Sequence, residues 1–245
     1  MTSKQTIIIE SGVTALARKG AEIFSRAASG SVAKRGRFAV AISGGSTPRS
    51  MHRMLGEEPL NSAIPWNKTD LFWVDERCVA KNHPDSNFGA AKKDFLNRIP
   101  IPRAHIHPLQ EDLSPEESAF WYQQKLVSFF QPKMHEFPLF DLIFLGMGTD
   151  GHTASLFPGQ SALNEMKRWV VAVKGGNPDV HRLTLTFPVI NRGKQIVFMI
   201  SGKHKASVVK SALTGIPSGL PAQRVQPLKG GLIWLLDREA ASLLD

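Results

Sequence analysis

Cysteine is almost absent from this sequence, and long apolar runs are missing altogether. Cys78 is the only cysteine among 245 residues, so an internal disulfide and a thiolate metal cluster are both excluded. No segment has the roughly 18 consecutive apolar residues of a membrane-spanning helix. The first residues, MTSKQTIIIESG, lack the basic and apolar regions of a secretory signal. We therefore expect a cytoplasmic protein without membrane contact.

Signs of a domain boundary are also missing. No repeat, low-complexity segment or long linker interrupts the chain, so we expect residues 1–245 to form a single domain. Apolar residues make up 42% of the sequence and charged residues 21%, which is ordinary for a globular protein.

The charge is less ordinary, because the formal net charge is +9. The first 37 residues hold seven lysines and arginines against two glutamates. A nucleic-acid surface is one explanation, but zinc-finger and RNA-binding signatures are absent, as is aromatic interleaving. We favour a solvated basic helix face and no nucleic-acid partner. A basic protein also attracts phosphorylated metabolites.

Apolar runs and helical periodicities alternate along the chain. The runs predict strands, and the segments between several of them have helical spacing or a capping signature. This alternation predicts an α/β fold with a doubly wound, mainly parallel sheet and helices on both faces, as in Rossmann-like proteins. The expected strands cover Thr6–Ile9, Arg37–Ser43, Asp70–Arg77, Phe140–Leu145, Trp169–Lys174, Leu183–Phe187, Gln195–Ile200 and Gly231–Leu236.

The segment from Phe140 to Gly159 joins a buried strand to reactive side chains. Its apolar start suits a strand covered on both faces. The glycines that follow let the backbone turn sharply, and Asp150 and His152 lie just past the carboxyl end of the strand. Ligands bind at that edge of open α/β sheets. We therefore predict that His152 lies in a functional site.

A second strand leads into Ser43, Gly44, Gly45, Ser46 and Thr47, and a helical segment follows. Unpaired backbone N–H groups at a helix N-terminus suit an anion, and the hydroxyls add donors. A phosphate is the natural ligand. The loop matches neither a Walker loop nor a dinucleotide-binding loop, so an ordinary capped turn remains the alternative.

Charged residues lie at the ends of three other predicted strands. Asp75, Glu76 and Arg77 end one run, and they indicate either a solvated turn or groups aimed into the crevice of the glycine loop. Arg182 precedes another strand, and Lys203 follows a further one. Both are placed to bind an anion. His105 and His107 share one face of a short extended segment, but no third metal ligand lies nearby, so we predict no metal site.

Six segments together resemble the 6-phosphogluconolactonase family, which shares its fold with the glucosamine-6-phosphate isomerase/deaminase family. They span most of the chain: SGGSTP from Ser43, WVDER from Trp73, DSNFG from Asp85, GMGTDGHTASLFP from Gly146, RLTLTFPVIN from Arg182 and SGKHKA from Ser201. Deaminase relatives place an acidic residue a few positions after the histidine, usually followed by proline. Here no carboxylate lies among Thr153 to Phe157, which favours the lactonase.

The resemblance implies hydrolysis of 6-phospho-D-glucono-1,5-lactone to 6-phosphogluconate in the oxidative pentose phosphate pathway, without a metal or organic cofactor. In this interpretation His152 takes a proton from water and later gives it to the leaving oxygen, because imidazole titrates near neutrality. Asp150 orients that ring. Arg182, Lys203 and the loop from Gly44 to Thr47 bind the phosphate, while Asp75 and Arg77 face the sugar.

Three alternatives remain open from the sequence. Ser155 lies near His152 and is a candidate nucleophile, although the chain lacks the G-x-S-x-G elbow. An amino-sugar phosphate isomerase or deaminase is a second possibility. A non-catalytic sugar-phosphate sensor is the third, but it needs a DNA-binding segment for which the chain has no spare length. The oligomeric state does not follow from the sequence.

Overall fold

The structure is a computed structural model that describes residues 5–110, 113–134, 136–214 and 219–244. Its centre is a six-stranded sheet in the order β1-β9-β8-β5-β2-β3, and every neighbouring pair is parallel. The strands are β1 (Gln5–Glu10), β2 (Phe38–Ile42), β3 (Thr69–Trp73), β5 (Leu142–Leu145), β8 (Gln195–Ile200) and β9 (Gly231–Asp237). The predicted parallel α/β fold is confirmed.

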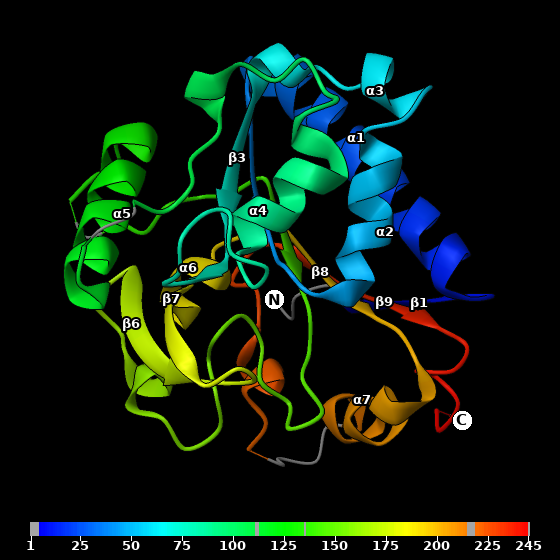
Figure 1. Cartoon of the computed structure of the whole chain (residues 1–245). Coiled ribbons are helices and arrows are strands. Elements are labelled where there is room, and N and C mark those ends of the chain that lie inside the picture. The colour runs from blue at the N-terminus through cyan, green and yellow to red at the C-terminus, as the bar shows by residue number, and fades with distance from the viewer. Residues whose placement is uncertain (1–4, 111–112, 135, 215–218, 245) are drawn as a thin grey trace.

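Apolar side chains cover both faces of this sheet, since successive strand residues point to opposite sides. In β2, Phe38, Val40 and Ile42 belong to one buried cluster. Ala39 and Ala41 belong to the other. Figure 1 shows α1 (Val13–Arg35) and α2 (Ser46–Leu55) on one side of the sheet and α5 (Pro115–Phe130) on the other. The sequence therefore reads as continuous apolar runs because both faces are buried.

The remaining helices are short. They are α3 (Leu60–Ala63), α4 (Asn87–Ala91), α6 (Phe187–Ile190) and α7 (Ala206–Leu213). A π-helical turn, Lys92–Leu96, continues α4. The long helix α5 begins with the capping box that its sequence predicts: the Glu117 N–H donates to the Ser114 hydroxyl, and the Glu117 carboxylate accepts from the Ser114 N–H. No helix among the described residues has both the length and the apolar character needed to cross a membrane.

A second, three-stranded antiparallel sheet corrects the sequence-based expectation. It pairs β4 (Asp75–Arg77) with β7 (Val180–Leu185), and β7 with β6 (Val170–Gly175). The predicted strand Asp70–Arg77 is therefore two strands. They separate at Val74, whose N–H donates to Ile42 in the main sheet while its carbonyl accepts from Leu185 in the second sheet. Apolar patterning could not reveal this change of partner.

The parallel topology gathers several loops at one edge. β8, β5 and β2 are neighbours, so their carboxyl ends lie side by side. The loops that follow them begin at Ser201, Gly146 and Ser43. The second sheet adds β4 and β7 to the same region. Residues far apart in the sequence therefore surround one space at the carboxyl edge of the sheet.

Candidate active site

A cavity of about 220 Å³ lies at this edge. Its lining comes from the three loops, from β4, β7 and the end of β8, and from the starts of α2 and α4: Ser43, Gly44, Gly45, Ser46, Thr47, Pro48, Asp75, Arg77, Asn87, Gly146, Met147, Gly148, His152, Ala154, Arg182, Met199, Ile200, Ser201 and Lys205. The sequence-predicted residues Ser43 to Thr47, Asp75, Arg77, His152 and Arg182 are thus brought together. Asp150 lies behind His152, and Lys203 is not in the lining.

The turn after β5 is built to present His152. The Gly148 N–H donates to the His152 carbonyl at 2.9 Å, and the Gly151 N–H donates to the Gly148 carbonyl at 3.0 Å. A Cβ at Gly148 would collide with His152 Nδ1 and with the Asp150 carboxylate. Only glycine fits there, because the histidine–aspartate pair occupies the space of a side chain.

Asp150 holds the imidazole at one nitrogen. Its Oδ1 lies 2.6 Å from His152 Nδ1 and also accepts from the His152 N–H at 3.1 Å. Burial alone would raise the pKa of Asp150, but hydrogen bonds from His152 and its charge lower that pKa below its usual value. Because Nδ1 is engaged, Nε2 is the nitrogen left for a molecule in the cavity. The sequence did not guarantee this contact.

The glycine loop after β2 leads directly into α2. Gly45 has a φ of +99°, which favours glycine, and α2 begins at Ser46. The Thr47 and Ser201 hydroxyl oxygens lie 3.0 Å apart, so they join this loop to the one after β8. A Cβ on Gly44 would collide with the Asn87 side chain. This packing explains why residue 44 is a glycine.

Asp75 is buried and firmly held. The Ser155 hydroxyl donates to its Oδ2 at 2.7 Å, and the Asn87 amide donates to its backbone carbonyl at 2.9 Å. Ser155 has no exposed surface and does not line the cavity. Its hydroxyl is therefore engaged with Asp75 and not with His152, which speaks against the serine-nucleophile alternative.

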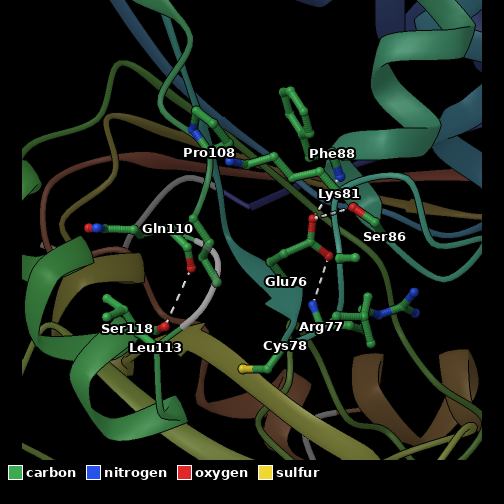
Figure 2. Close-up of a pocket in the computed structure, with 13 residues that line it drawn as sticks. Glu76, Arg77, Cys78, Lys81, Ser86, Phe88, Pro108, Gln110, Leu113 and Ser118 are labelled. Atoms are coloured by element: carbon green, nitrogen blue, oxygen red, sulfur yellow. Dashed lines mark hydrogen bonds between the residues drawn. The ribbon is translucent and has the colours of Figure 1, made fainter.

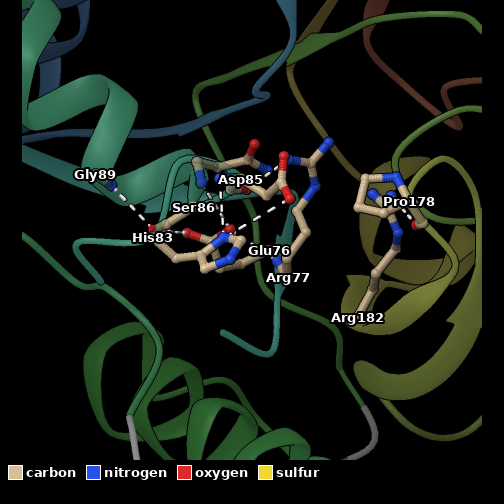
Figure 3. A network of polar contacts seen from close by, with 9 residues as sticks. Glu76, Arg77, His83, Asp85, Ser86, Gly89, Pro178 and Arg182 are labelled. Carbon is tan, nitrogen blue, oxygen red and sulfur yellow. Dashed lines mark hydrogen bonds and ion pairs between the residues drawn. The ribbon is translucent and has the colours of Figure 1, made fainter. Parts of the chain in front are cut away.

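Arg77 and Arg182 are direct cross-strand partners of β4 and β7. Like charges at such positions repel each other, so a bound anion would stabilise them. Arg182 donates through Nε to the Gly175 carbonyl at 2.7 Å and through Nη2 to the Pro178 carbonyl at 3.2 Å. Burial, followed by the charge of Arg77, lowers the pKa of Arg182. Figure 3 shows Arg77 reaching from β4 toward the side where Arg182 lies against Pro178.

Lys205 lines the cavity, whereas Lys203, the lysine named from the sequence, does not. Gly202, with a φ of +93°, and the 3₁₀ turn Lys203–Lys205 redirect the chain, so Lys203 is exposed while Lys205 lines the cavity. Burial lowers the pKa of Lys205, and the charge of Asp150 partly offsets that effect. Asp237 fixes this turn, since both of its oxygens accept from the Gly202 N–H at 3.0 and 3.1 Å.

Sequence reasoning also missed Asn87 and Ser201. Both belong to the quoted segments DSNFG and SGKHKA, but the sequence gives no direction for a side chain at the start of a helix or turn. Asn87 directly follows the N-cap residue Ser86, and no local signal indicates that its amide faces the cavity. Their presence in the lining adds an amide and a hydroxyl to the predicted site.

Glu76 is not part of the cavity. Its carboxylate accepts hydrogen bonds from the N–H groups of Arg77, Asn87 and Phe88 and from the Ser86 hydroxyl. Burial raises its pKa, while these donors act in the opposite direction. Figure 2 shows Glu76 and Cys78 in a second cavity, of about 370 Å³, which shares Arg77 with the first. Glu76 thus ties the start of α4 to β4, and the solvated-turn interpretation of this segment is wrong.

No group of three or more potential metal-binding side chains occurs in the described part of the chain. The two histidines that the sequence analysis considered as metal ligands, His105 and His107, have different surroundings. His107 Nε2 lies 2.9 Å from Asp70 Oδ1, and the buried Nδ1 of His105 has no hydrogen-bond partner.

Comparison with known proteins identifies the family of the chain. The model of the family described as "Glucosamine-6-phosphate isomerases/6-phosphogluconolactonase" matches residues 12–234. The chain belongs to this family. A 6-phosphogluconolactonase from Synechocystis is 43% identical over 217 residues, which is 87% of each chain. Another, from Nostoc, is 37% identical over 246 residues, which is 99% of each chain.

A solved structure of 6-phosphogluconolactonase from Trypanosoma brucei has the same architecture. It superposes with a TM-score of 0.89 at 27% identity, and the match covers 100% of both chains. The likeness therefore covers the whole length of the chain.

Proposed function

We propose that this protein hydrolyses 6-phospho-D-glucono-1,5-lactone to 6-phospho-D-gluconate, the activity named for the relatives. The observation that carries the proposal is the cavity itself. One side holds an imidazole whose Nδ1 is occupied by Asp150. The other lining residues include three cationic side chains, Arg77, Arg182 and Lys205. A dianionic phosphate and a hydrolysable carbonyl need this combination of groups.

The phosphate is bound by the glycine loop together with Arg182 and Lys205. The N–H groups at the start of α2 and the Ser46 and Thr47 hydroxyls supply neutral donors, and the helix dipole adds positive potential. Arg182 has two donors committed to backbone carbonyls, which orients its remaining N–H groups. Asp75 then accepts hydrogen bonds from the sugar hydroxyls, and Arg77 stabilises the negative charge that develops on the carbonyl oxygen.

His152 Nε2 serves as base and then as acid. It accepts a proton from water as the water oxygen attacks the lactone carbonyl carbon, giving a tetrahedral oxyanion. When the bond from that carbon to the ring oxygen breaks, the imidazolium returns the proton to the leaving oxygen. Asp150 keeps the proton of the neutral ring on Nδ1 and stabilises the imidazolium. Protein side chains and water suffice for each step, so we expect no cofactor, and activity should survive dialysis against a chelator.

The reaction is tested on freshly prepared lactone at neutral pH, with acid release followed above the spontaneous rate. The protein should accelerate opening of the phosphorylated lactone strongly. A rate equal to the spontaneous one would refute the proposal. Release of ammonia from glucosamine 6-phosphate would instead favour the deaminase. The residue packed against His152 speaks against that alternative, because it is Phe157 and not an acid.

Phosphate recognition has a matched pair of lysines for its test. Lys205→Ala should lower kcat/KM for the phosphorylated lactone by about tenfold or more, while leaving hydrolysis of unphosphorylated gluconolactone much less affected. Lys203→Ala removes the same charge two residues away, outside the cavity, and should change neither. Equal effects of the two substitutions would show that the assignment of Lys205 is wrong.

A further inference from the structure

Phe157 contacts two parts of the site without lining the cavity. Its ring centroid lies 4.7 Å from that of the His152 imidazole, at an interplanar angle of 49°. The guanidinium carbon of Arg182 lies 5.8 Å from the same ring centroid. Phe157 itself is 7% exposed. One buried ring therefore touches both the proposed base and the proposed phosphate anchor.

The backbone around Phe157 is shaped to hold the ring there. The Leu156 N–H donates to the Thr153 carbonyl, which closes a tight turn with Ala154 at a φ of +50°, a conformation that is unfavourable for alanine. On the other side, a Cβ at Gly176 would press on both the Arg182 guanidinium and the Phe157 ring, and one at Gly175 would crowd the ring. Close packing thus encloses the phenyl ring between two segments of the site.

The hydrogen bond that Asp150 accepts from His152 Nδ1 is not enough by itself to fix the imidazole. The side chains of His152 and Asp150 are 31% and 50% exposed, and exposed ion pairs are weakly held. A single contact at Nδ1 also leaves the ring free to tilt. The Phe157 face limits that tilt, and it also packs against the guanidinium, which is itself tethered to the carbonyls of Gly175 and Pro178.

We propose that Phe157 is a positioning residue that sets the separation between the His152 imidazole and the Arg182 guanidinium. This inference rests on the proposed lactonase function. A substrate whose phosphate is bound by Arg182 then has its carbonyl held beside Nε2. Displacing reacting groups by about 1 Å can cost up to a hundredfold in rate. The phosphate would therefore contribute to kcat as well as to binding.

The test compares Phe157→Leu, which removes the ring, with Phe157→Tyr, which keeps it. Phe157→Leu should lower kcat for the phosphorylated lactone by about tenfold with a smaller change in KM. It should also reduce the preference for the phosphorylated over the unphosphorylated lactone by a similar factor. Phe157→Tyr should restore most of both losses. Phe157→Met replaces the leucine variant if that variant does not fold.

Phe187→Leu is the matched control. Phe187 is also buried and packs against a guanidinium, since the Arg224 carbon lies 4.8 Å from its ring centroid, but Arg224, unlike Arg182, does not line the cavity. This variant should lose stability without changing the substrate preference. The inference is overturned if Phe157→Leu keeps the wild-type kcat and preference, if it lowers both substrates equally, or if Phe187→Leu changes the preference as much. Failure of the lactonase proposal can be told apart from failure of this inference. In the first case the unsubstituted protein would not accelerate hydrolysis of either lactone.

Discussion

Among the described residues, two histidine–aspartate pairs have a ring nitrogen within 3 Å of the carboxylate. They lie at opposite ends of the parallel sheet, and only one faces the cavity. His152 Nδ1 lies 2.6 Å from Asp150 beyond the carboxyl end of β5. His107 Nε2 lies 2.9 Å from Asp70, the second residue of β3. The two contacts are similar in length and chemistry. Their surroundings are what differ.

The His107 ring is packed as a core group. It stacks on Phe72 with ring centroids 4.2 Å apart at 9°, and Phe129 lies 5.5 Å away. His152 instead has glycines beneath it and three cationic side chains around the adjoining cavity. A histidine–aspartate pair is therefore insufficient evidence for catalysis. The pair must also lie at an edge where strand ends leave space and where charges suit the substrate.

Substituting each histidine in turn should separate the two pairs most clearly. His152→Ala is expected to lower the enzymatic rate by about 10²–10⁴-fold, because it removes the general base. His107→Ala should retain a rate close to that of the unchanged protein. Both are measured as lactone hydrolysis above the spontaneous rate, on proteins with verified circular dichroism spectra. A large rate loss in His107→Ala would mean that the two ends are coupled.

His52 extends the comparison to a histidine with no hydrogen-bonded acid. Burial lowers its pKa to about 4, and its Nε2 has no hydrogen-bond partner. The unfolded chain binds this proton near pH 6.5, so stability is unaffected above that pH and is lost as the pH falls toward 4. The loss amounts to about 3 kcal/mol at most.

Urea unfolding at pH 7, 5.5 and 4.5 measures this effect. His52→Phe preserves the ring beside Phe95 and should show a smaller loss of unfolding free energy between pH 7 and 4.5. An equal loss in both proteins would assign the acid sensitivity to other groups.

Neutralising each aspartate sharpens the comparison further. Asp150→Asn should lower kcat about ten- to a hundredfold, because an amide neither fixes the same tautomer nor stabilises the imidazolium. Asp70→Asn should leave kcat unchanged. The decisive quantity is the ratio of the two kcat values at pH 7. A ratio near one would indicate that Asp150 has no more than a structural role.

The smallest expected effect concerns stability at the second pair. His107→Ala removes a stacked ring and leaves Asp70 without its partner, which should reduce the free energy of unfolding by about 1–2 kcal/mol. His152→Ala should cost less, since that side chain is more exposed. Chemical denaturation of both variants checks this order. The reverse order would mean that the turn that presents His152 contributes more to stability than its exposure suggests.

The strands and the main features of the site followed from sequence because they depend on local pattern. Apolar runs marked the buried strands, the capping box marked the start of α5, and the glycines around Asp150 marked the turn that presents His152. The family resemblance rested on the same segments. These features need only the period of side chains along a strand or helix and the conformational freedom of glycine.

Other features depended on contacts between distant segments. Lys205 lines the cavity and Lys203 does not, because Asp237 holds the start of a 3₁₀ turn that changes the direction of the chain between them. Ser155 turned from a candidate nucleophile into the partner of Asp75, which lies 80 positions earlier. The antiparallel sheet exists because β4 leaves β3 to pair with β7. None of these choices has a local signature.

The sequence by itself determined the parallel α/β fold, the family, and the position of a histidine at a strand end. Only the tertiary structure decided which charges surround that histidine and which histidine–aspartate pair faces a cavity. The physical reason is the range of the interactions. Strands and turns form through interactions between residues that are close in the sequence. The direction of a long cationic side chain depends instead on packing between loops that the sheet order brings together.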